Sequence, residues 1–294
     1  MKFALDVPNS GKYGDPKVLV DLAVEAESSG WDGFFIWDHL VSGGRSPVID
    51  TWTVLPAIAG ATKQIRFGPM VTPLARRRPW IIARQAATLD RLSDGRLIIG
   101  VGLGQFSKKE FGVFGDEPDP VARGELLDES LDIIAGLWSG EPFAYDGRHF
   151  HLSRSVFRPV PVQVPRVPVW VGGRWPNKAP MRRAARWDGA FAIPAEGGLS
   201  DEMTAEETGQ MITYVNDHRT TAYEFEFVHA GLLTGHHDVD ALKVEAYAEV
   251  GTTWWLEQIY SSRMTPAKLA AFIRQGPPSK SAHLRVADPT RPPE

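Results

Sequence analysis

The segment from Ile65 to Gly104 limits most strongly what this chain can fold into, because it predicts strand, helix and strand in succession. An apolar run over 65–71 precedes a stretch beginning at Pro79, in which apolar residues recur every three or four positions, the spacing of one buried helix face. The run over 96–101 lacks polar alternation, as is typical of strands buried on both faces of a parallel sheet. A crossover of this length suits parallel strands, so the segment predicts one βαβ unit.

The same alternation of strand and helix continues through the rest of the chain. Strands are expected over 2–7, 32–36, 65–71, 96–101, 169–171, 189–193, 224–229 and 252–256, and a predicted helix follows each of them. The seventh run alternates apolar and polar residues, so it also fits an antiparallel edge strand. Eight such units predict an α/β fold of the (β/α)8 TIM barrel type, with a doubly wound sheet as the alternative.

The repeat is interrupted after the fourth βα unit. Asp146-Gly147 between aromatic residues predicts a β-hairpin, and the proline-rich stretch over 155–168 predicts an extended connector. We therefore expect a hairpin-containing insertion over about 141–168 within a single barrel domain of residues 1–275. The proline-rich tail over 276–294 is predicted to be disordered or to lie over the surface.

The composition argues against several kinds of protein. A net charge of −4 gives no indication of nucleic-acid binding, and the absence of cysteine excludes disulfides, thiolate nucleophiles and cysteine-based metal sites. No apolar run approaches the roughly 20 residues of a membrane helix, and the N-terminus enters a strand without a signal-peptide pattern. We therefore expect a cytoplasmic protein with neither nucleic acid nor membrane as a partner.

Functional residues of a barrel lie at the carboxyl ends of its strands. That rule selects Asp6, Asp38, His39, Met70, Thr72, residues 102–105, residues 172–174, Glu196, His229 and Glu257. His39 can exchange protons near neutral pH, although a histidine bonded into its loop is equally expected. Gly172-Gly173 before a helix near Pro176 offers backbone N–H groups to a phosphate, with Arg174 adding charge; otherwise the glycines only permit a tight turn.

Other motifs are weaker. The glycines over 100–104 resemble a dinucleotide fingerprint, but the third comes one residue early and no helix begins there, so a Rossmann interpretation fails. Arg76 to Arg78 follow a strand end and either meet an anionic cofactor tail or form a solvated run. His236-His237-Asp238 has no partner at ligand spacing, so no metal is expected.

Several of these segments together resemble the bacterial luciferase-like superfamily of flavin- and coenzyme F420-dependent oxidoreductases. The matching segments are GFFIWDH at 33–39, FGPMVTP at 67–73, ARQAATLDRLSDGRL at 83–97, GVGLG at 100–104 and VWVGG at 169–173. They follow the family order over about residues 1–193, and the segment at 83–97 is the most specific. The resemblance implies a (β/α)8 barrel, a flavin or deazaflavin ring in its mouth, a small organic substrate and a homodimer.

The resemblance also implies roles for individual residues. Asp38 and His39 would lie at the reactive edge of the ring, with His39 acting as acid/base or holding the substrate oxygen. Met70, with a non-proline cis peptide at Pro69–Met70, would lie behind the ring. Cofactor contacts are implied for Thr72, Gly102, Leu103, Gly104, Gly172, Gly173 and Arg174. Gln105 departs from the family, which often carries Glu or an aromatic residue there.

The adjacent Asp38 and His39 resemble the F420 branch more than the FMN branch, and the arginine run would suit the acidic tail of F420. The sequence therefore favours an enzyme that transfers hydride between F420 and a small organic substrate. An FMN-dependent monooxygenase using reduced flavin and O2 is the alternative, followed by a flavin-binding barrel without turnover. A phosphosugar isomerase or aldolase barrel is a third alternative. It would require a lysine or a carboxylate pair at strand ends, and the strand ends here offer no lysine. Segments 105–120 and 196–205, with Trp254-Trp255, are expected to wall a partly apolar substrate pocket.

Overall fold

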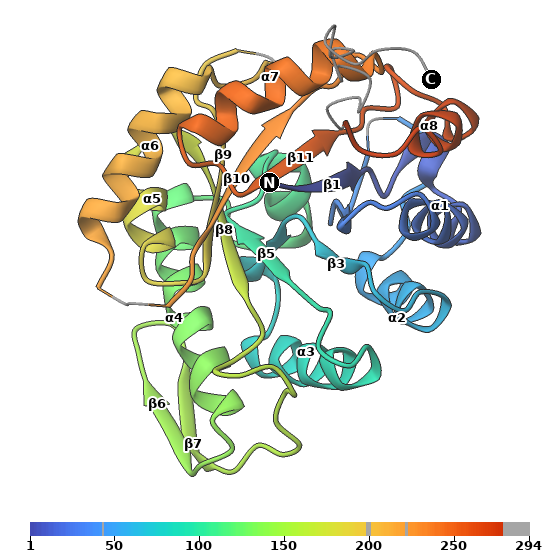
Figure 1. Cartoon of the computed structure of the whole chain (residues 1–294). Helices are drawn as coiled ribbons and strands as arrows, with labels where there is room; N and C mark the ends of the chain where they lie inside the picture. Colours follow the sequence, from blue (N-terminus) through green and yellow to red (C-terminus); the bar gives the residue numbers. More distant parts are fainter. Residues whose placement is uncertain (43, 198–200, 221–222, 279–294) are drawn as a thin grey trace, which may run out of the picture.

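The strands of the computed structural model, which describes residues 1–42, 44–197, 201–220 and 223–278, form a ring that helices surround (Figure 1). The parallel strands are β1 (Lys2–Val7), β2 (Gly33–Ile36), β3 (Arg66–Pro69), β4 (Thr72–Pro73), β5 (Ile99–Gly102), β8 (Val169–Trp175), β9 (Gly189–Pro194), β10 (Glu226–Gly231) and β11 (Trp254–Gln258). The helices between and after them are α1 (Pro16–Ser28), α2 (Thr51–Ala61), α3 (Pro79–Leu92), α4 (Pro120–Trp138), α5 (Lys178–Ala184), α6 (Ala205–His218), α7 (His237–Glu249) and α8 (Pro266–Ile273).

The ring closes within the third βα unit. The strands pair in the order β3-β2-β1-β11-β10-β9-β8-β5-β4, and each of these pairings is parallel. β3 and β4 are successive parts of one predicted strand, interrupted at Met70 and Val71, and a parallel bridge from Phe67 to Leu97 ties β3 to the segment before β5. The (β/α)8 barrel is therefore confirmed over the doubly wound sheet, and the antiparallel alternative for the seventh run is wrong, because β10 is parallel to both neighbours.

Capping side chains fix where several helices begin. Asp15 accepts a hydrogen bond from the amide of Lys17, and Thr204 forms a capping box with Glu207. The predicted helix after Pro176 is shorter than expected, because β8 continues through Trp175 and leaves only the seven residues of α5. Going around the ring, α8 packs beside α1, so the last unit meets the first (Figure 1).

Large aromatic side chains fill the barrel interior near the end where the strands begin. The rings of Trp170 and Trp254 meet edge to face with centroids 5.2 Å apart, and Phe35 lies 5.3 Å from Trp170. Because side chains alternate along β11, Trp255 instead packs in the layer between strands and helices. Trp254 and Trp255 are both buried, so the expectation that they wall a substrate pocket is wrong. These aromatic side chains close the end of the barrel where the strands begin, so a site can form only at the end where the strands end.

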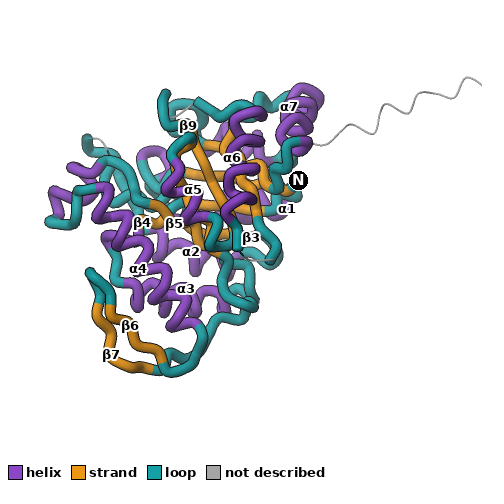
Figure 2. Tube along the Cα trace, turned by 90° about the vertical axis from the view of Figure 1, so that its left-hand side faces the viewer, coloured by secondary structure: helices purple, strands orange, loops and turns teal. Residues whose placement is uncertain are grey.

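The predicted hairpin lies outside the ring, beside α3 and α4 (Figures 1 and 2). Its strands β6 (Phe143–Asp146) and β7 (His151–Ser155) pair antiparallel, which confirms the hairpin. The turn is longer than the predicted Asp146-Gly147 pair, because it extends over residues 147–150 and β7 begins only at His151. A 2.9 Å hydrogen bond from the Gly147 amide to the Phe150 carbonyl closes this turn. The limits of the insertion and of the barrel domain stay predictions, and most of the predicted tail lies outside the described residues.

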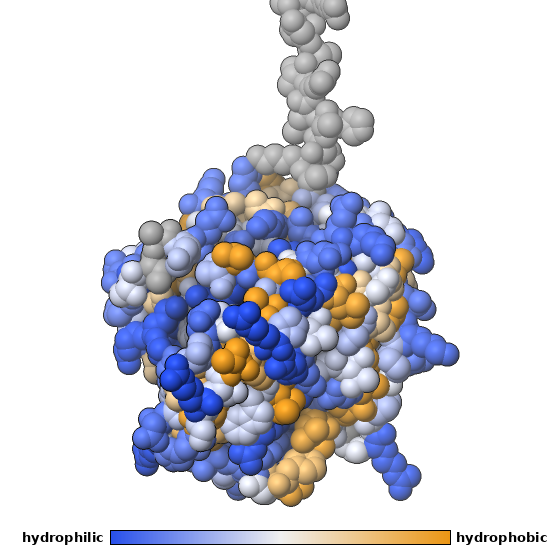
Figure 3. Space-filling model, turned by 90° about the horizontal axis from the view of Figure 1, so that it is seen from below, coloured by the Kyte–Doolittle hydropathy of each residue, from blue (hydrophilic) through white to orange (hydrophobic). Residues whose placement is uncertain are grey.

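The surface gives limited information about partners. Among the described helices, none combines the length and the apolar character that a membrane-spanning helix requires. The face seen in Figure 3 is largely hydrophilic, with apolar side chains in separate groups rather than one continuous patch. The predicted homodimer therefore gains no assigned interface on this face and stays a prediction.

Candidate active site

A cavity of about 310 Å³ opens at the mouth of the barrel where the strands end. Strands from all around the ring, and the segments that follow them, supply its walls. They include Asp6, His39, Met70, Arg174, Ile193 and Gln258. This is the end of a barrel at which functional sites form, and the volume falls at the lower end of the roughly 300–1,000 Å³ of small-molecule pockets.

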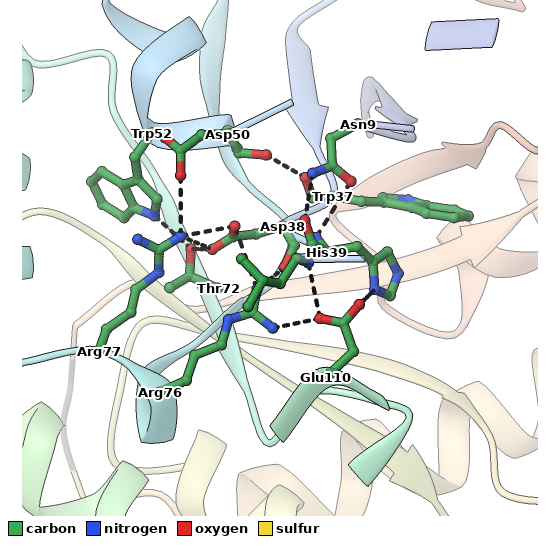
Figure 4. A network of polar contacts seen from close by, with 12 residues as sticks. Asn9, Trp37, Asp38, His39, Asp50, Trp52, Thr72, Arg76, Arg77 and Glu110 are labelled. Atoms are coloured by element: carbon green, nitrogen blue, oxygen red, sulfur yellow. Dashed lines mark hydrogen bonds and ion pairs between the residues drawn. The ribbon is translucent and has the colours of Figure 1, made fainter. Parts of the chain in front are cut away.

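His39 follows β2 and is held in the cavity wall by its backbone and its ring. Asn9 donates from its side-chain nitrogen to the His39 carbonyl at 2.8 Å and accepts from the His39 amide at 3.3 Å. The imidazole lies between two aromatic rings, with centroids 5.7 Å from Trp37 and 5.8 Å from Phe106. The His39 side chain keeps 23% of its surface exposed. It is therefore oriented by the contacts drawn in Figure 4 and still reachable from the cavity that it lines.

Glu110 is the residue that orients the imidazole. Its Oε1 lies 3.4 Å from His39 Nδ1, and its carboxylate also accepts from the amides of Leu40 at 2.9 Å and Val41 at 3.1 Å. Arg76 completes the set with a 2.8 Å ion pair, and the Glu110 side chain is only 1% exposed. A carboxylate facing Nδ1 favours the tautomer with the proton on Nδ1, so Nε2 is the nitrogen left for a ligand.

Sequence reasoning missed Glu110. It lies in a single helical turn, Ser107–Phe111, inside the segment 105–120 that was expected to be a loop. Its only signal is one acidic residue among glycines, lysines and aromatic residues, and no spacing rule places such a residue opposite His39, which is 71 positions earlier. The contact depends on how the loop after β5 folds back over the end of β2.

The acidity of Glu110 makes a testable contribution to stability. Burial alone would raise the pKa of Glu110, but hydrogen bonds from His39, Leu40 and Val41 lower it to about 2, against an ordinary value of 4.5. Because the folded-state pKa is the lower one, the stabilisation is complete above pH 4.5 and is lost as the pH falls toward 2. We expect Glu110→Gln to lower the thermal unfolding midpoint strongly at neutral pH and much less at about pH 3.

The control for this prediction is Glu125→Gln. Glu125 also pairs with a histidine, His149, at 2.9 Å, but its side chain is 38% exposed on the surface beside the hairpin. Its loss should change the midpoint little at either pH. Equal deficits of Glu110→Gln at both pH values would show that the carboxylate does not stabilise the fold through its charge.

Asp38, expected at the reactive edge, lines the cavity beside His39 but is buried, and its carboxylate is held by neighbouring side chains. Both its oxygens lie 2.9 Å from Arg77 Nη2, and Oδ2 also accepts from the Thr72 hydroxyl at 2.9 Å. Thr72 in turn accepts from the indole nitrogen of Trp52 at 2.8 Å and is fully buried. Thr72 therefore lies behind the cavity wall, against the expectation that it contacts the cofactor, and Asp38 is occupied by the protein itself (Figure 4).

The arginine run is not the open cationic patch that the sequence suggested. Arg76 pairs with Glu110 and also donates to the Asp38 carbonyl, and its side chain is 5% exposed. Arg77 pairs with Asp38 as described, so its charge is also balanced internally. Arg78 is exposed and lies over the ring of Trp80. Two of the three arginines thus stabilise the wall of the cavity, and the run gives no support to an anionic tail at this place.

Met70 lines the cavity as expected, on a backbone shaped by glycines. The non-proline cis peptide is Met70–Val71, one residue later than predicted. A Cβ at Gly100 would come 2.5 Å from Met70 Sδ, and one at Gly102 or Gly172 would come 3.0 Å from a Val71 methyl group. These glycines therefore make room for the two residues that line the cavity, and their own backbones lie behind them.

The remaining predicted contacts divide into two groups. Gly104 and Arg174 line the cavity, and Arg174 donates to the Pro194 carbonyl at 2.9 Å. Leu103 does not line it; its carbonyl accepts from Arg123 at 2.9 Å. Gly173 lies within β8, paired with Ala192, where a Cβ would come 2.4 Å from Pro180. Gly172 and Gly173 are therefore in extended strand rather than in a tight turn, and α5 begins five residues later, whereas their contact with a phosphate stays a prediction.

Two other strand-end candidates are buried in the walls. His229 packs on Tyr247 with ring centroids 3.9 Å apart, and burial lowers its pKa. Glu257 pairs with Arg263 and is fully buried, and burial raises its pKa to about 7 against the lowering by Arg263. Within the described ranges, no three His, Asp or Glu side chains gather as a metal site.

Comparisons with known proteins agree with this architecture. The F420-dependent glucose-6-phosphate dehydrogenase of Nakamurella multipartita is 35% identical over 182 residues, which cover 60% of this chain and 52% of the relative. The enzyme of the same name from Amycolatopsis mediterranei is 35% identical over 196 residues, 65% of this chain and 57% of the relative. The chain thus matches little more than half the length of these curated relatives.

Solved structures share the fold over nearly the whole chain. An F420-dependent secondary alcohol dehydrogenase superposes with a TM-score of 0.74 over 92% of this chain and 97% of that one, at 17% identity. A monooxygenase from Streptomyces bottropensis gives 0.71 over 94% and 97%, at 20% identity. At such identities the likeness concerns the fold alone.

The family itself follows from a match over most of the sequence. The family model described as luciferase-like monooxygenase matches residues 3–253. This range includes the barrel from β1 to the end of α7 and the wall residues His39, Met70 and Glu110. The predicted family, with its fold and its enzymatic character, is confirmed, and the chain belongs to the luciferase-like monooxygenase family.

Proposed function

We propose that this chain is an oxidoreductase that uses coenzyme F420 to transfer hydride to or from a small organic substrate in the cavity. The curated relatives named above are F420-dependent dehydrogenases, which supports F420 over FMN. The observation that carries the proposal is the imidazole of His39, reachable from the cavity and held through Nδ1 by the buried Glu110. Such a pair is suited to general acid–base chemistry on a substrate oxygen.

The cavity walls fit a planar ring. Met70, Val71, Phe191 and Ile193 offer apolar surface, whereas His39 supplies a polar group. A volume of about 310 Å³ suits a ring and a small substrate rather than a whole cofactor, so the tail would leave over the rim. Lys109 and Arg174 line the cavity and would meet the acidic tail there. These residues, with Gly104, would hold the cofactor.

The bound cofactor would supply the site that accepts or gives the hydride. In the direction of alcohol oxidation, His39 Nε2 would accept the proton of the substrate hydroxyl group. Glu110 holds Nδ1–H and stabilises the imidazolium that this transfer creates. Trp37 and Phe106 flank the imidazole and limit its contact with water. Asp38 takes no part in proton transfer; it fixes the chain beside His39.

An FMN-dependent monooxygenase remains the second candidate, because the family model is described as luciferase-like monooxygenase. In that case reduced flavin would react with O2, and the cavity would have to keep water away. A barrel that binds a flavin without turnover would show binding and no dependence on His39. The cytoplasmic location and the homodimer remain proposals beside these.

The two cofactors separate the candidates directly. We expect F420 to bind the purified protein with micromolar affinity, measured by quenching of fluorescence, and FMN to bind at least about tenfold more weakly. With F420 bound, glucose 6-phosphate and simple secondary alcohols are the first substrates to test under exclusion of air. Tight binding of FMN with none of F420, together with oxygen consumption, would establish the monooxygenase instead.

A further inference from the structure

A buried carboxyl group that the mechanism above does not use faces the cavity from β1. Asp6 is only 2% exposed and lines the cavity. Side chains alternate along a strand; Ala4 packs inside the barrel and Leu5 packs in the layer between strands and helices. Asp6 therefore points inward, as Ala4 does, at the end of the barrel where the cavity opens.

The hydrogen bonds of Asp6 leave one oxygen free for a ligand. Oδ2 accepts from the side-chain nitrogen of Gln258 at 2.9 Å, whereas Oδ1 has no hydrogen-bond partner among the described residues. The hydroxyl of Tyr260 donates to the other end of the Gln258 amide at 3.4 Å, which fixes the orientation of that amide. A buried polar oxygen without a partner is uncommon in proteins and requires an explanation.

The charges around Asp6 do not neutralise it. None of the ion pairs found among the described residues involves Asp6, and Arg263, on the segment after β11, pairs with Glu257. Burial raises the pKa of Asp6 well above its usual range and outweighs the lowering by Gln258 and Trp37. The carboxyl group thus keeps its proton more readily than an ordinary aspartate. Because Oδ2 accepts from Gln258, Oδ1 is the oxygen that can accept from a ligand when Asp6 is ionised and can donate to it when Asp6 is protonated.

We propose that Asp6 and Gln258 form a substrate subsite that binds the oxygen of an uncharged hydroxyl or carbonyl group and disfavours an anionic group. The inference rests on the proposed function and narrows its substrate class to small uncharged alcohols and ketones. An anionic oxygen at this place would meet Asp201, which lines the same cavity, and would also meet the negative charge of Asp6 whenever that carboxyl group is ionised. Three cations among the described residues line the cavity from other elements: Lys109 lies in the loop after β5, Arg174 lies near the end of β8, and Arg76 is paired with Glu110.

Infrared difference spectroscopy tests the subsite without turnover. Spectra of the full chain minus those of Asp6→Asn isolate the carbonyl band of a protonated Asp6 at neutral pH. We expect the band in the wild-type protein, a shift to lower frequency with cyclohexanol or cyclohexanone, and no such shift with cyclohexanecarboxylate. A missing band, an unmoved band with both uncharged probes, or an equal shift with the carboxylate would overturn the proposal.

The spectra are recorded with and without F420, so the outcome does not depend on the redox proposal. A shift with the uncharged probes and no hydride transfer would leave the subsite standing and remove the proposed function. Asp188→Asn is the matched control, because Asp188 also has a pKa raised by burial but lies just before β9, at the opposite end of the barrel. This variant should leave the probe-induced shift intact.

Kinetics provide the second readout. For an uncharged substrate that turns over, we expect Asp6→Asn and Asp6→Ala to raise KM about tenfold, the effect of one lost hydrogen bond, with a smaller change in kcat. Asp6→Asn should lose less than Asp6→Ala, because the amide can still donate. Preferred turnover of glucose 6-phosphate over glucose, with KM unchanged in Asp6→Asn, would show that the subsite does not select for uncharged groups.

Discussion

Replacing His39 by alanine is expected to lower turnover by about 10²–10⁴-fold, the usual contribution of a general acid or base, while the protein keeps its cofactor. The imidazole is reachable from the cavity, and the backbone of residue 39 stays held by Asn9, so the loop should keep its course. We expect the thermal unfolding midpoint to change little. Steady-state hydride transfer and cofactor titration on the same preparation measure the two effects separately.

The matched control is His149→Ala. His149 also pairs with a glutamate, Glu125, at 2.9 Å, and its side chain is 22% exposed, close to the 23% of His39. It lies in the turn of the hairpin and does not line the cavity. Its loss should leave turnover unchanged. Full activity of His39→Ala would remove His39 from the mechanism and favour a barrel in which the cofactor alone carries the chemistry.

Asp38→Asn is expected to act on stability and only indirectly on turnover. The amide cannot balance the buried guanidinium of Arg77 or the nearby one of Arg76, whose side chains are 21% and 5% exposed. Breaking a buried ion pair from one side costs about 3–5 kcal/mol, so the free energy of unfolding should fall by roughly that amount. Chemical denaturation at neutral pH measures it.

A surface ion pair provides the comparison for this prediction. Asp128 also pairs with an arginine through two bonds, 2.6 and 2.8 Å from Arg183, but its side chain is 38% exposed. Asp128→Asn should cost no more than about 1 kcal/mol. If Asp38→Asn were equally mild yet abolished hydride transfer, Asp38 would belong at the reacting atoms, as the family resemblance first implied.

The fold was predictable from sequence because its signals are local. Eight apolar runs alternate with helical segments, several of which begin at a capping side chain, and parallel strands require the crossovers that these helices provide. The errors occur where one element changes the limits of the next. β8 extends through Gly172 and Gly173 because Phe191 and Ala192 of β9 pair with them, and no feature of residues 169–175 alone indicates that.

The position of the candidate site was predictable from the sequence, but the ion pairs and hydrogen bonds among its side chains were not. The rule for strand ends selected His39, Met70 and Asp6, and all three line the cavity. It also selected Asp38, which lines the cavity as well, but whose carboxylate pairs with Arg76 and Arg77, 38 and 39 positions later in the chain. Whether a polar side chain at the cavity is available to a ligand depends on such distant partners. Glu110 was missed for the same reason.

The most direct test of the central claim, that this cavity holds the cofactor ring, is the F420 titration repeated on Ile193→Trp. Ile193 lines the cavity of about 310 Å³, and an indole in its place would project further into the space that the ring is proposed to occupy. Ile81→Trp, the same change at a half-exposed position on the outside of α3, is the control. We predict that quenching by F420 is lost in Ile193→Trp and retained in Ile81→Trp. Unchanged F420 affinity in a folded Ile193→Trp protein would contradict the account, because the ring would then bind elsewhere.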